Sequence, residues 1–305
     1  MTRRCRPLGW SRVRGGASCP AALAELATGG LYFLLLVLAA GCNQSEPGGS
    51  PAAGGSAERD GVTLGSRPAR PSPVAAAESA IDPRELRIRG WHAVQGLPCE
   101  LAQFETVFWE PEDTSSLRAW LSSYPPLASA EVLEVGTGTG LLAVWCAWRG
   151  ARHVVATDIN PQAVANAIYN AAWCGWEDRI EVRLVPADRP APFAVVAADE
   201  RFDLIISNPP WEDAAVGEVA AYALYDPGFE LLDGLLQQAA GYLRPHGKLL
   251  LAYGARAPIE RIEQLAPELG WQVQRHDTRS LGSLPAVFVP GMLLELSPVA
   301  PRPER

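Results

Sequence analysis

Several residue types are scarce in this 305-residue chain, and their scarcity excludes some kinds of site. The six cysteines include no Cys-x-x-Cys pair and no Cys/His cluster, so the sequence predicts no zinc or other metal site. The four histidines are scattered and none stands in a catalytic context. Methionine occurs twice, at Met1 and Met292, so a later translation start would need a non-Met codon, for example at Val62 or Val74.

Positive charge is scarce in the larger part of the chain. Residues 1–80 hold 8 basic and 5 acidic side chains, whereas residues 81–305 hold 18 basic and 29 acidic ones. Because binding to a phosphate backbone rests on cations, this balance argues against a nucleic-acid duplex as substrate. A local basic edge would reverse that argument, and its candidate members are Arg152, Arg179, Arg183 and Arg189.

The apolar run at residues 31–38 is too short to span a bilayer comfortably. A basic stretch precedes it, and Ala39-Ala40-Gly41-Cys42 follows, a pattern that resembles a bacterial lipoprotein cleavage site. We therefore predict a signal peptide over residues 1–41 and membrane anchoring through a lipidated Cys42.

The composition changes twice after this segment. Residues 42–80 are rich in Gly, Ser, Pro and Ala and have almost no large apolar side chains, so we expect a disordered linker. From residue 81 the composition is that of a globular domain, and we assign residues 81–305 to one catalytic domain.

Strand-like and helix-like segments alternate through this domain, which predicts an α/β fold with a mostly parallel seven-stranded sheet and helices on both faces. A short link before the last strand predicts an antiparallel closing hairpin. Strands are expected at 131–135, 153–157, 180–185, 202–207, 248–253, 271–276 and 286–296, and helices at 138–149, 161–173, 228–243 and 257–268. Further extended segments are expected at 86–89 and 104–109, and a helix from Asp113 through Leu121.

The most informative segment is 132–140, an apolar strand that runs into glycines at positions 136, 138 and 140. Glycines in such a loop let a ligand lie directly against the main chain, because no Cβ intrudes. The spacing is Gly-x-Gly-x-Gly, which differs from the Gly-x-Gly-x-x-Gly fingerprint of dinucleotide sites. The loop therefore favours S-adenosylmethionine over NAD and argues against a dehydrogenase.

Polar residues also follow the next three predicted strands. Asp158 stands roughly 20 residues past the glycines, where a ribose diol would be held. Asp188 follows the third strand, and Asn208-Pro209-Pro210-Trp211 follows the fourth. Ligands of open parallel sheets bind at the carboxyl ends of the strands, so we expect these groups to converge on one site.

With these motifs, residues 104–296 resemble the class I S-adenosylmethionine-dependent methyltransferases. The Asn-Pro-Pro-aromatic tetrad is similar to that of enzymes that methylate planar nitrogens, in particular the release factor glutamine methyltransferase and methyltransferase small domain group. The resemblance implies a Rossmann-like sheet and S-adenosyl-L-methionine as cofactor.

The resemblance also implies roles for individual residues. The loop of Gly136, Thr137, Gly138 and Gly140 would pass under the methionine and ribose parts of the cofactor. Glu134 would hold the ammonium group and Asp158 the ribose hydroxyls, although Asp158 could instead cap the helix that begins at Pro161. Contacts with the adenine would come from Ile159 and Asp188, and Asn208 would also border the cofactor.

Asn208 and Pro209 are expected to carry the chemistry. An amide nitrogen is a poor nucleophile because its lone pair is delocalised, so its N–H groups must be held. The Asn208 side-chain oxygen and the Pro209 carbonyl can accept those hydrogen bonds, while Pro210 stiffens the loop and Trp211 stacks on a planar acceptor. No classical general base is needed.

Segment 108–114, Phe-Trp-Glu-Pro-Glu-Asp-Thr, resembles the part of these enzymes that covers cofactor and acceptor. The glutamine methyltransferases have a pattern closer to Pro-Arg-Pro-Glu-Thr, and here an acidic run replaces the arginine. This difference weakens the expectation of a release factor substrate and leaves methyl transfer intact.

Three functions stay open at this point. The first is methylation of a planar nitrogen, with a protein side-chain amide favoured as acceptor. The others are methylation of an exocyclic base amine in RNA or DNA, and a non-catalytic, membrane-anchored binding module. An export signal conflicts with a cofactor made in the cytosol, so the sequence leaves the compartment, the membrane face and the oligomeric state undetermined.

Overall fold

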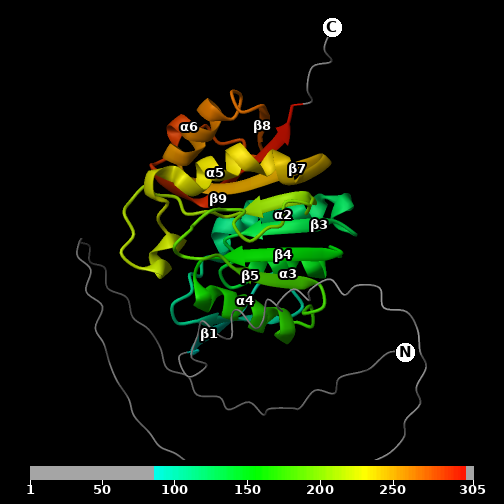
Figure 1. Cartoon of the computed structure of the whole chain (residues 1–305). Helices are drawn as coiled ribbons and strands as arrows, with labels where there is room; N and C mark the ends of the chain where they lie inside the picture. Colours follow the sequence, from blue (N-terminus) through cyan, green and yellow to red (C-terminus); the bar gives the residue numbers. More distant parts are fainter. Residues whose placement is uncertain (1–85, 300–305) are drawn as a thin grey trace, which may run out of the picture. The chain divides into compact units, whose positions relative to one another are not determined.

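The computed structural model describes residues 86–299, and most of its strands form one sheet with the order β5-β4-β3-β6-β7-β9-β8 (Figure 1). The strands are β3 (Glu131–Val135), β4 (His153–Asp158), β5 (Ile180–Leu184), β6 (Phe202–Ser207), β7 (Leu243–Ala255), β8 (Trp271–Arg275) and β9 (Val287–Pro298). The pairs from β5 through β7 are parallel, and β9 is antiparallel to both of its neighbours. The predicted α/β class, the seven strands and the antiparallel last strand are confirmed.

Helices cover both faces of the sheet because successive strand residues point to opposite sides. Val132 packs in an apolar cluster with α2 (Ser115–Ser123), α3 (Leu141–Trp148) and α4 (Pro161–Trp173). Leu133 packs in a second cluster with α5 (Glu230–Gln238) and α6 (Arg256–Leu265). The short 3-10 helices are η2 (Pro111–Thr114), η3 (Pro125–Leu127), η4 (Val219–Ala223), η5 (Pro227–Phe229), η6 (Ala239–Tyr242) and η7 (Leu281–Ser283).

A separate antiparallel hairpin, β1 (Ile88–Ala93) and β2 (Glu100–Phe104), is fastened to α4. The backbone N–H of Ala102 donates to Asn170 Oδ1 at 2.8 Å, and that of Phe104 donates to Asn166 Oδ1 at 2.9 Å. A disulfide joins Cys99 to Cys174 at the end of α4, with the Cα atoms 5.8 Å apart. The sequence patterns gave no indication of this disulfide.

The prediction of an extended segment at 104–109 was wrong, because β2 ends at Phe104. The chain turns there, and the N–H of Val107 donates back to the carbonyl of Phe104 at 3.1 Å. The first extended segment likewise begins later than expected, at Ile88 rather than at residue 86.

Positive backbone φ angles explain two helix boundaries that differ from expectation. The helix expected from 138 begins at Leu141, because Gly138 and Gly140 adopt φ values of 55° and 82°. The helix expected from 228 begins at Glu230, after Gly228 and Phe229 with φ values of 65° and 57°. A right-handed helix does not accommodate such values.

The predicted signal peptide, the lipidated Cys42, the linker at 42–80 and the domain start at 81 all lie outside the described residues. Within residues 86–299, no helix combines the length and apolar character needed to cross a bilayer. The same residues contain no group of three or more side chains suited to hold a metal ion. Cys146, in α3, is a buried free thiol.

Candidate active site

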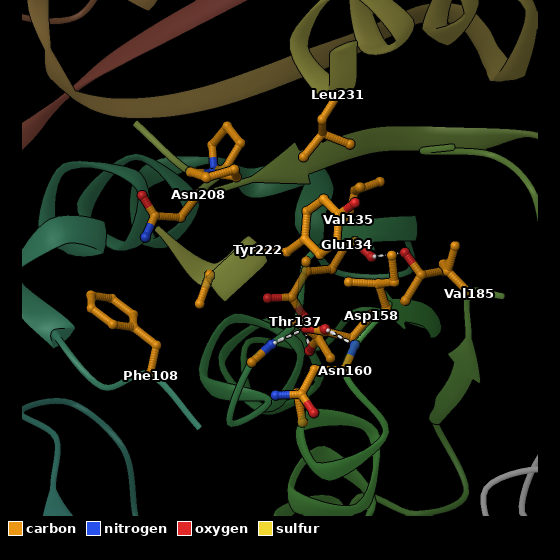
Figure 2. A pocket seen from close by; sticks show the side chains of 18 of the residues that line it. Phe108, Glu134, Val135, Thr137, Asp158, Asn160, Val185, Asn208, Tyr222 and Leu231 are labelled. Carbon is orange, nitrogen blue, oxygen red and sulfur yellow. Dashed lines mark hydrogen bonds between the residues drawn. The ribbon is translucent and has the colours of Figure 1, made fainter. Parts of the chain in front are cut away.

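A cavity lies at the carboxyl ends of four neighbouring parallel strands, as the strand-end motifs predicted. Its wall includes Gly136 after β3, Asp158 at the end of β4, Val185 after β5 and Asn208 after β6. Figure 2 shows Glu134, Asp158 and Asn208 around this cavity, together with the aromatic side chains of Phe108 and Tyr222.

The glycine loop forms one wall with its backbone. The N–H groups of Gly136 and Thr137 both donate to the carbonyl of Thr157 at 2.9 Å, which ties the loop to β4. Gly136 and Gly138 have positive φ, and a Cβ built on either would meet no atom within 4 Å. These two glycines therefore leave space for a ligand directly against the main chain.

Gly140 has a different function from the other two glycines. It does not line the cavity, and a Cβ at this position would lie 3.0 Å from the Cα of Ala167 in α4. The structure therefore places Gly140 at the close packing of α3 against α4, where the lack of a side chain matters for folding.

Asp158 braces the loop from the neighbouring strand. Its Oδ2 accepts a hydrogen bond from the N–H of Gly138, and its Oδ1 accepts from the N–H of Asn160, both at 2.8 Å. The helix cap is Asn160, whose side-chain oxygen accepts from the N–H of Gln162 at 3.0 Å. Asp158 thus lines the cavity, and burial raises the pKa of its carboxyl group.

Glu134 lies deeper, with 1% of its surface exposed. The hydroxyl of Thr137 donates to Glu134 Oε2 at 2.7 Å. Burial nevertheless dominates and raises the pKa of Glu134 to about 8. A positively charged ligand group in the cavity would favour the ionised form of this carboxyl, since opposite charges stabilise each other at low polarity.

Asn208, Pro209 and Pro210 line the cavity on the β6 side. The Oδ1 atom of Asn208 is buried and accepts no hydrogen bond from any described residue. A buried acceptor without a partner costs about 1–3 kcal/mol, so this oxygen is suited to receive a donor from a ligand.

Two predicted site residues lie elsewhere. Asp188 is exposed in the turn after β5 and does not line the cavity. Trp211 is half-buried and packs over Gly254 of β7, where a Cβ would collide with its ring. The aromatic residues that line the cavity are Phe108, Trp109, Tyr222 and Tyr225.

Tyr222 was missed because its position depends on the long segment between β6 and α5. Nothing in its local sequence marks it, and only the course of this segment, through η4, brings it to the cavity. Ile159 and Thr137 do line the cavity, as expected from the sequence.

The charge of the cavity wall is one-sided. Among the described residues that line it there is no Lys, Arg or His, whereas five carboxyl groups do so: Glu110, Glu134, Asp158, Asp226 and Glu230. S-adenosylmethionine carries a sulfonium, an ammonium and one carboxylate group, so its net charge is positive. The carboxyl groups of the wall, together with the open space over Gly136 and Gly138, fit that molecule.

A family model described as the methyltransferase small domain matches residues 106–273, more than half of the chain. The chain is 40% identical over 165 residues to the release factor glutamine methyltransferase of Cereibacter sphaeroides, covering 50% of this chain and 55% of that enzyme. It is 35% identical over 164 residues to the tRNA1(Val) (adenine(37)-N6)-methyltransferase of Tolumonas auensis, covering 51% of this chain and 64% of that enzyme.

One further relative and one solved structure extend this comparison. The release factor glutamine methyltransferase of Shewanella oneidensis is 32% identical over 201 residues, covering 58% of this chain and 68% of that enzyme. The SAM-dependent methyltransferase of Agrobacterium tumefaciens shares the fold, with a TM-score of 0.50 at 19% identity over 68% of this chain and 70% of that one. The chain therefore belongs to the methyltransferase small domain family.

Proposed function

We propose that this protein transfers the methyl group of S-adenosylmethionine to the nitrogen of a protein side-chain amide. The observation that carries the proposal is Asn208 Oδ1, a buried acceptor without a partner among the described residues, in a cavity without a lining cation. An amide N–H is the donor that would satisfy it.

The cofactor end of the cavity comprises the glycine loop and two carboxyl groups. Gly136 and Gly138 would lie against the cofactor, Glu134 would hold its ammonium group, and Asp158 would accept hydrogen bonds from its ribose hydroxyls. When bound, the cofactor supplies an electrophilic methyl group on sulfur, and the electrons of the broken S–C bond stay with the sulfur.

At the acceptor end, Asn208 Oδ1 and the Pro209 carbonyl would accept the two N–H bonds of the amide. This orients the nitrogen lone pair towards the methyl group and withdraws it from conjugation. The nitrogen forms the new N–C bond and loses one proton to solvent. Positioning and electrostatics supply the rate enhancement in this scheme.

A protein acceptor is supported over a nucleic acid by charge. Glu110 and Glu230, the exposed carboxylates that line the cavity, would repel phosphates. The arginines that could have formed a basic edge are partly neutralised, because Arg183 is paired with Glu181 and Glu200, and Arg152 with Glu131.

Methylation of an exocyclic base amine is the second candidate. The Tolumonas relative bears that activity in its name, and an exocyclic amine presents N–H groups of similar geometry to Asn208. The third candidate, a non-catalytic binding module, would bind the cofactor without turnover.

In the test, the purified full chain is incubated with S-adenosylmethionine that carries an isotope in its methyl group. The acceptor is either a set of peptides that contain glutamine and asparagine or unmodified tRNA. We expect label on peptide amides, located by mass spectrometry, and none on tRNA. If the tRNA acquires the isotope and the peptides do not, the proposal is overturned in favour of the second candidate. Cofactor binding by calorimetry without transfer to any acceptor would favour the binding module.

A further inference from the structure

Glu110 is an exposed carboxylate on the rim of the cavity. Its side chain accepts a weak hydrogen bond from the N–H of Glu112 at 3.4 Å, and it forms no ion pair with any residue of the described range. Glu110 therefore lines the cavity without an ion-pair partner among residues 86–299.

The backbone on both sides of Glu110 is anchored. The ring of Trp109 stacks on His92, with ring centroids 4.4 Å apart, and the ring of His92 is in turn bonded to Gln103. The carbonyl of Pro111 accepts from the buried Arg118 guanidinium at 2.9 Å. The rim carboxylate is thus carried by a fixed segment.

The acceptor end and this segment line the same cavity. Phe108, two residues before Glu110, is one of its lining residues, as is Asn208 (Figure 2). A substrate side chain whose amide reaches Asn208 would bring its neighbouring residues to the rim where Glu110 lies.

We infer that Glu110 selects acceptor polypeptides with a lysine or arginine beside the methylated amide. This inference rests on the proposed function and assigns its substrate class. An exposed carboxylate–cation pair changes affinity by up to about fivefold at low salt, and screening by salt removes the effect.

The test compares three peptides that differ only in the residues flanking one glutamine, which are lysine, serine or glutamate. Both methyl transfer, as kcat/KM, and peptide binding without cofactor, by fluorescence anisotropy, are measured for the wild-type protein, Glu110→Gln and Glu110→Arg. Glu105→Arg is the matched control, because Glu105 is exposed on the same segment and does not line the cavity.

We expect the wild-type protein to favour the lysine peptide over the glutamate peptide by about threefold to fivefold at low salt. Glu110→Gln removes the preference, Glu110→Arg reverses it, and Glu105→Arg keeps it. Equal methylation of all three peptides overturns the inference and leaves the proposed function standing. A charge preference in binding without methylation of any peptide overturns the proposed function instead, and absence of both binding and methylation overturns both.

Discussion

Asn208 carries a buried hydrogen-bond acceptor that receives no donor from the described part of the protein. The oxygen of its amide is buried and unpartnered among the described residues, although most buried acceptors in proteins are paired. Because Asn208 also lines the cavity, a ligand bound there could supply the missing donor. The neighbouring Pro209 and Pro210 hold the loop that carries it, so little conformational freedom is lost when an acceptor amide binds.

Replacement of Asn208 by alanine is therefore expected to lower kcat by at least about a hundredfold, because an oriented hydrogen-bond acceptor at the reacting atom is lost. Cofactor affinity should change by less than about threefold. Single-turnover methyl transfer and calorimetric titration of S-adenosylmethionine measure the two effects separately. Turnover near the wild-type rate would exclude the assigned role of Asn208.

Glu134 gives a prediction about pH. Its pKa of about 8 in the folded protein exceeds the ordinary value of 4.5, so between these values the folded state holds a proton that the unfolded chain releases. Stability from this residue is therefore present below pH 4.5 and is lost as the pH rises towards 8. Each unit of such a shift corresponds to about 1.4 kcal/mol.

Glu134→Gln keeps an acceptor for the Thr137 hydroxyl and cannot ionise. The difference in unfolding free energy between this variant and the wild-type protein should grow by several kcal/mol, roughly, from pH 5 to pH 8, as measured with urea at each pH. Wild-type cofactor affinity should rise with pH over the same window and become flat in the variant. Parallel stability curves for the two proteins would contradict the raised pKa.

At the scale of elements, two glycines in the turn from β3 into α3 have different surroundings, since one lines the cavity and the other packs against a helix. Gly138 lies on the cavity wall, and Gly140 lies against Ala167 of α4. The sequence presents the two glycines as equivalent members of one motif. The difference arises because the chain begins to coil at Leu141, which turns the last glycine away from the ligand and towards the neighbouring helix.

Alanine at these two positions should therefore have different effects. Gly138→Ala should weaken S-adenosylmethionine binding by about tenfold or more with a modest loss of stability, because the added Cβ projects into ligand space at a positive φ. Gly140→Ala should lower the unfolding free energy by about 2 kcal/mol or more through its clash with α4. Thermal unfolding and calorimetry distinguish the two. The reverse pattern would contradict this assignment.

The β1–β2 hairpin is attached to α4 and supports one side of the cavity. The side chains of buried Asn166 and Asn170 in α4 form hydrogen bonds with the backbone of β2 at Ala102 and Phe104. The disulfide Cys99–Cys174 also links the hairpin covalently to the end of α4. The hairpin leads directly into segment 107–111, which lines the cavity. Its attachment to α4 therefore holds one wall of the site.

Replacing Cys99 and Cys174 together by alanine should lower the unfolding free energy by about 2–5 kcal/mol, because the closed loop no longer restricts the unfolded chain. Cofactor affinity should fall as well, since segment 107–111 loses part of its support. Denaturant titration of the oxidised wild-type protein, the reduced wild-type protein and the double variant measures this. Equal stability of all three would show that the asparagine contacts alone suffice.

For the whole molecule, charge and compartment are the properties that matter. The acidic balance of residues 81–305 extends into the cavity, where no lysine, arginine or histidine lines the described wall. A disulfide persists in oxidising compartments and is rare in the cytosol. Cys99–Cys174 is therefore typical of an oxidising compartment, whereas S-adenosylmethionine is made in the cytosol. The predicted signal peptide lies outside the described residues and stays a prediction.

Cells of the source organism, treated with an alkylating reagent before lysis, should yield Cys99 and Cys174 unmodified and linked to each other. The buried thiol of Cys146 should be alkylated only after denaturation, because burial also raises its pKa. Peptide mapping by mass spectrometry reads out both. Alkylated Cys99 and Cys174 in intact cells would assign the domain to a reducing compartment.

The sequence by itself determined the alternating strands and helices, the glycine turn and the strand-end residues, because these depend on local periodicity and on backbone freedom. It therefore predicted one common site for Glu134, Gly136, Gly138, Asp158 and Asn208. Only the tertiary structure decided that Trp211 packs on β7, that Asp188 points to solvent, that Tyr222 reaches the cavity and that Cys99 meets Cys174. These contacts join segments far apart in the chain, or depend on the course of a long loop, and no local pattern encodes them.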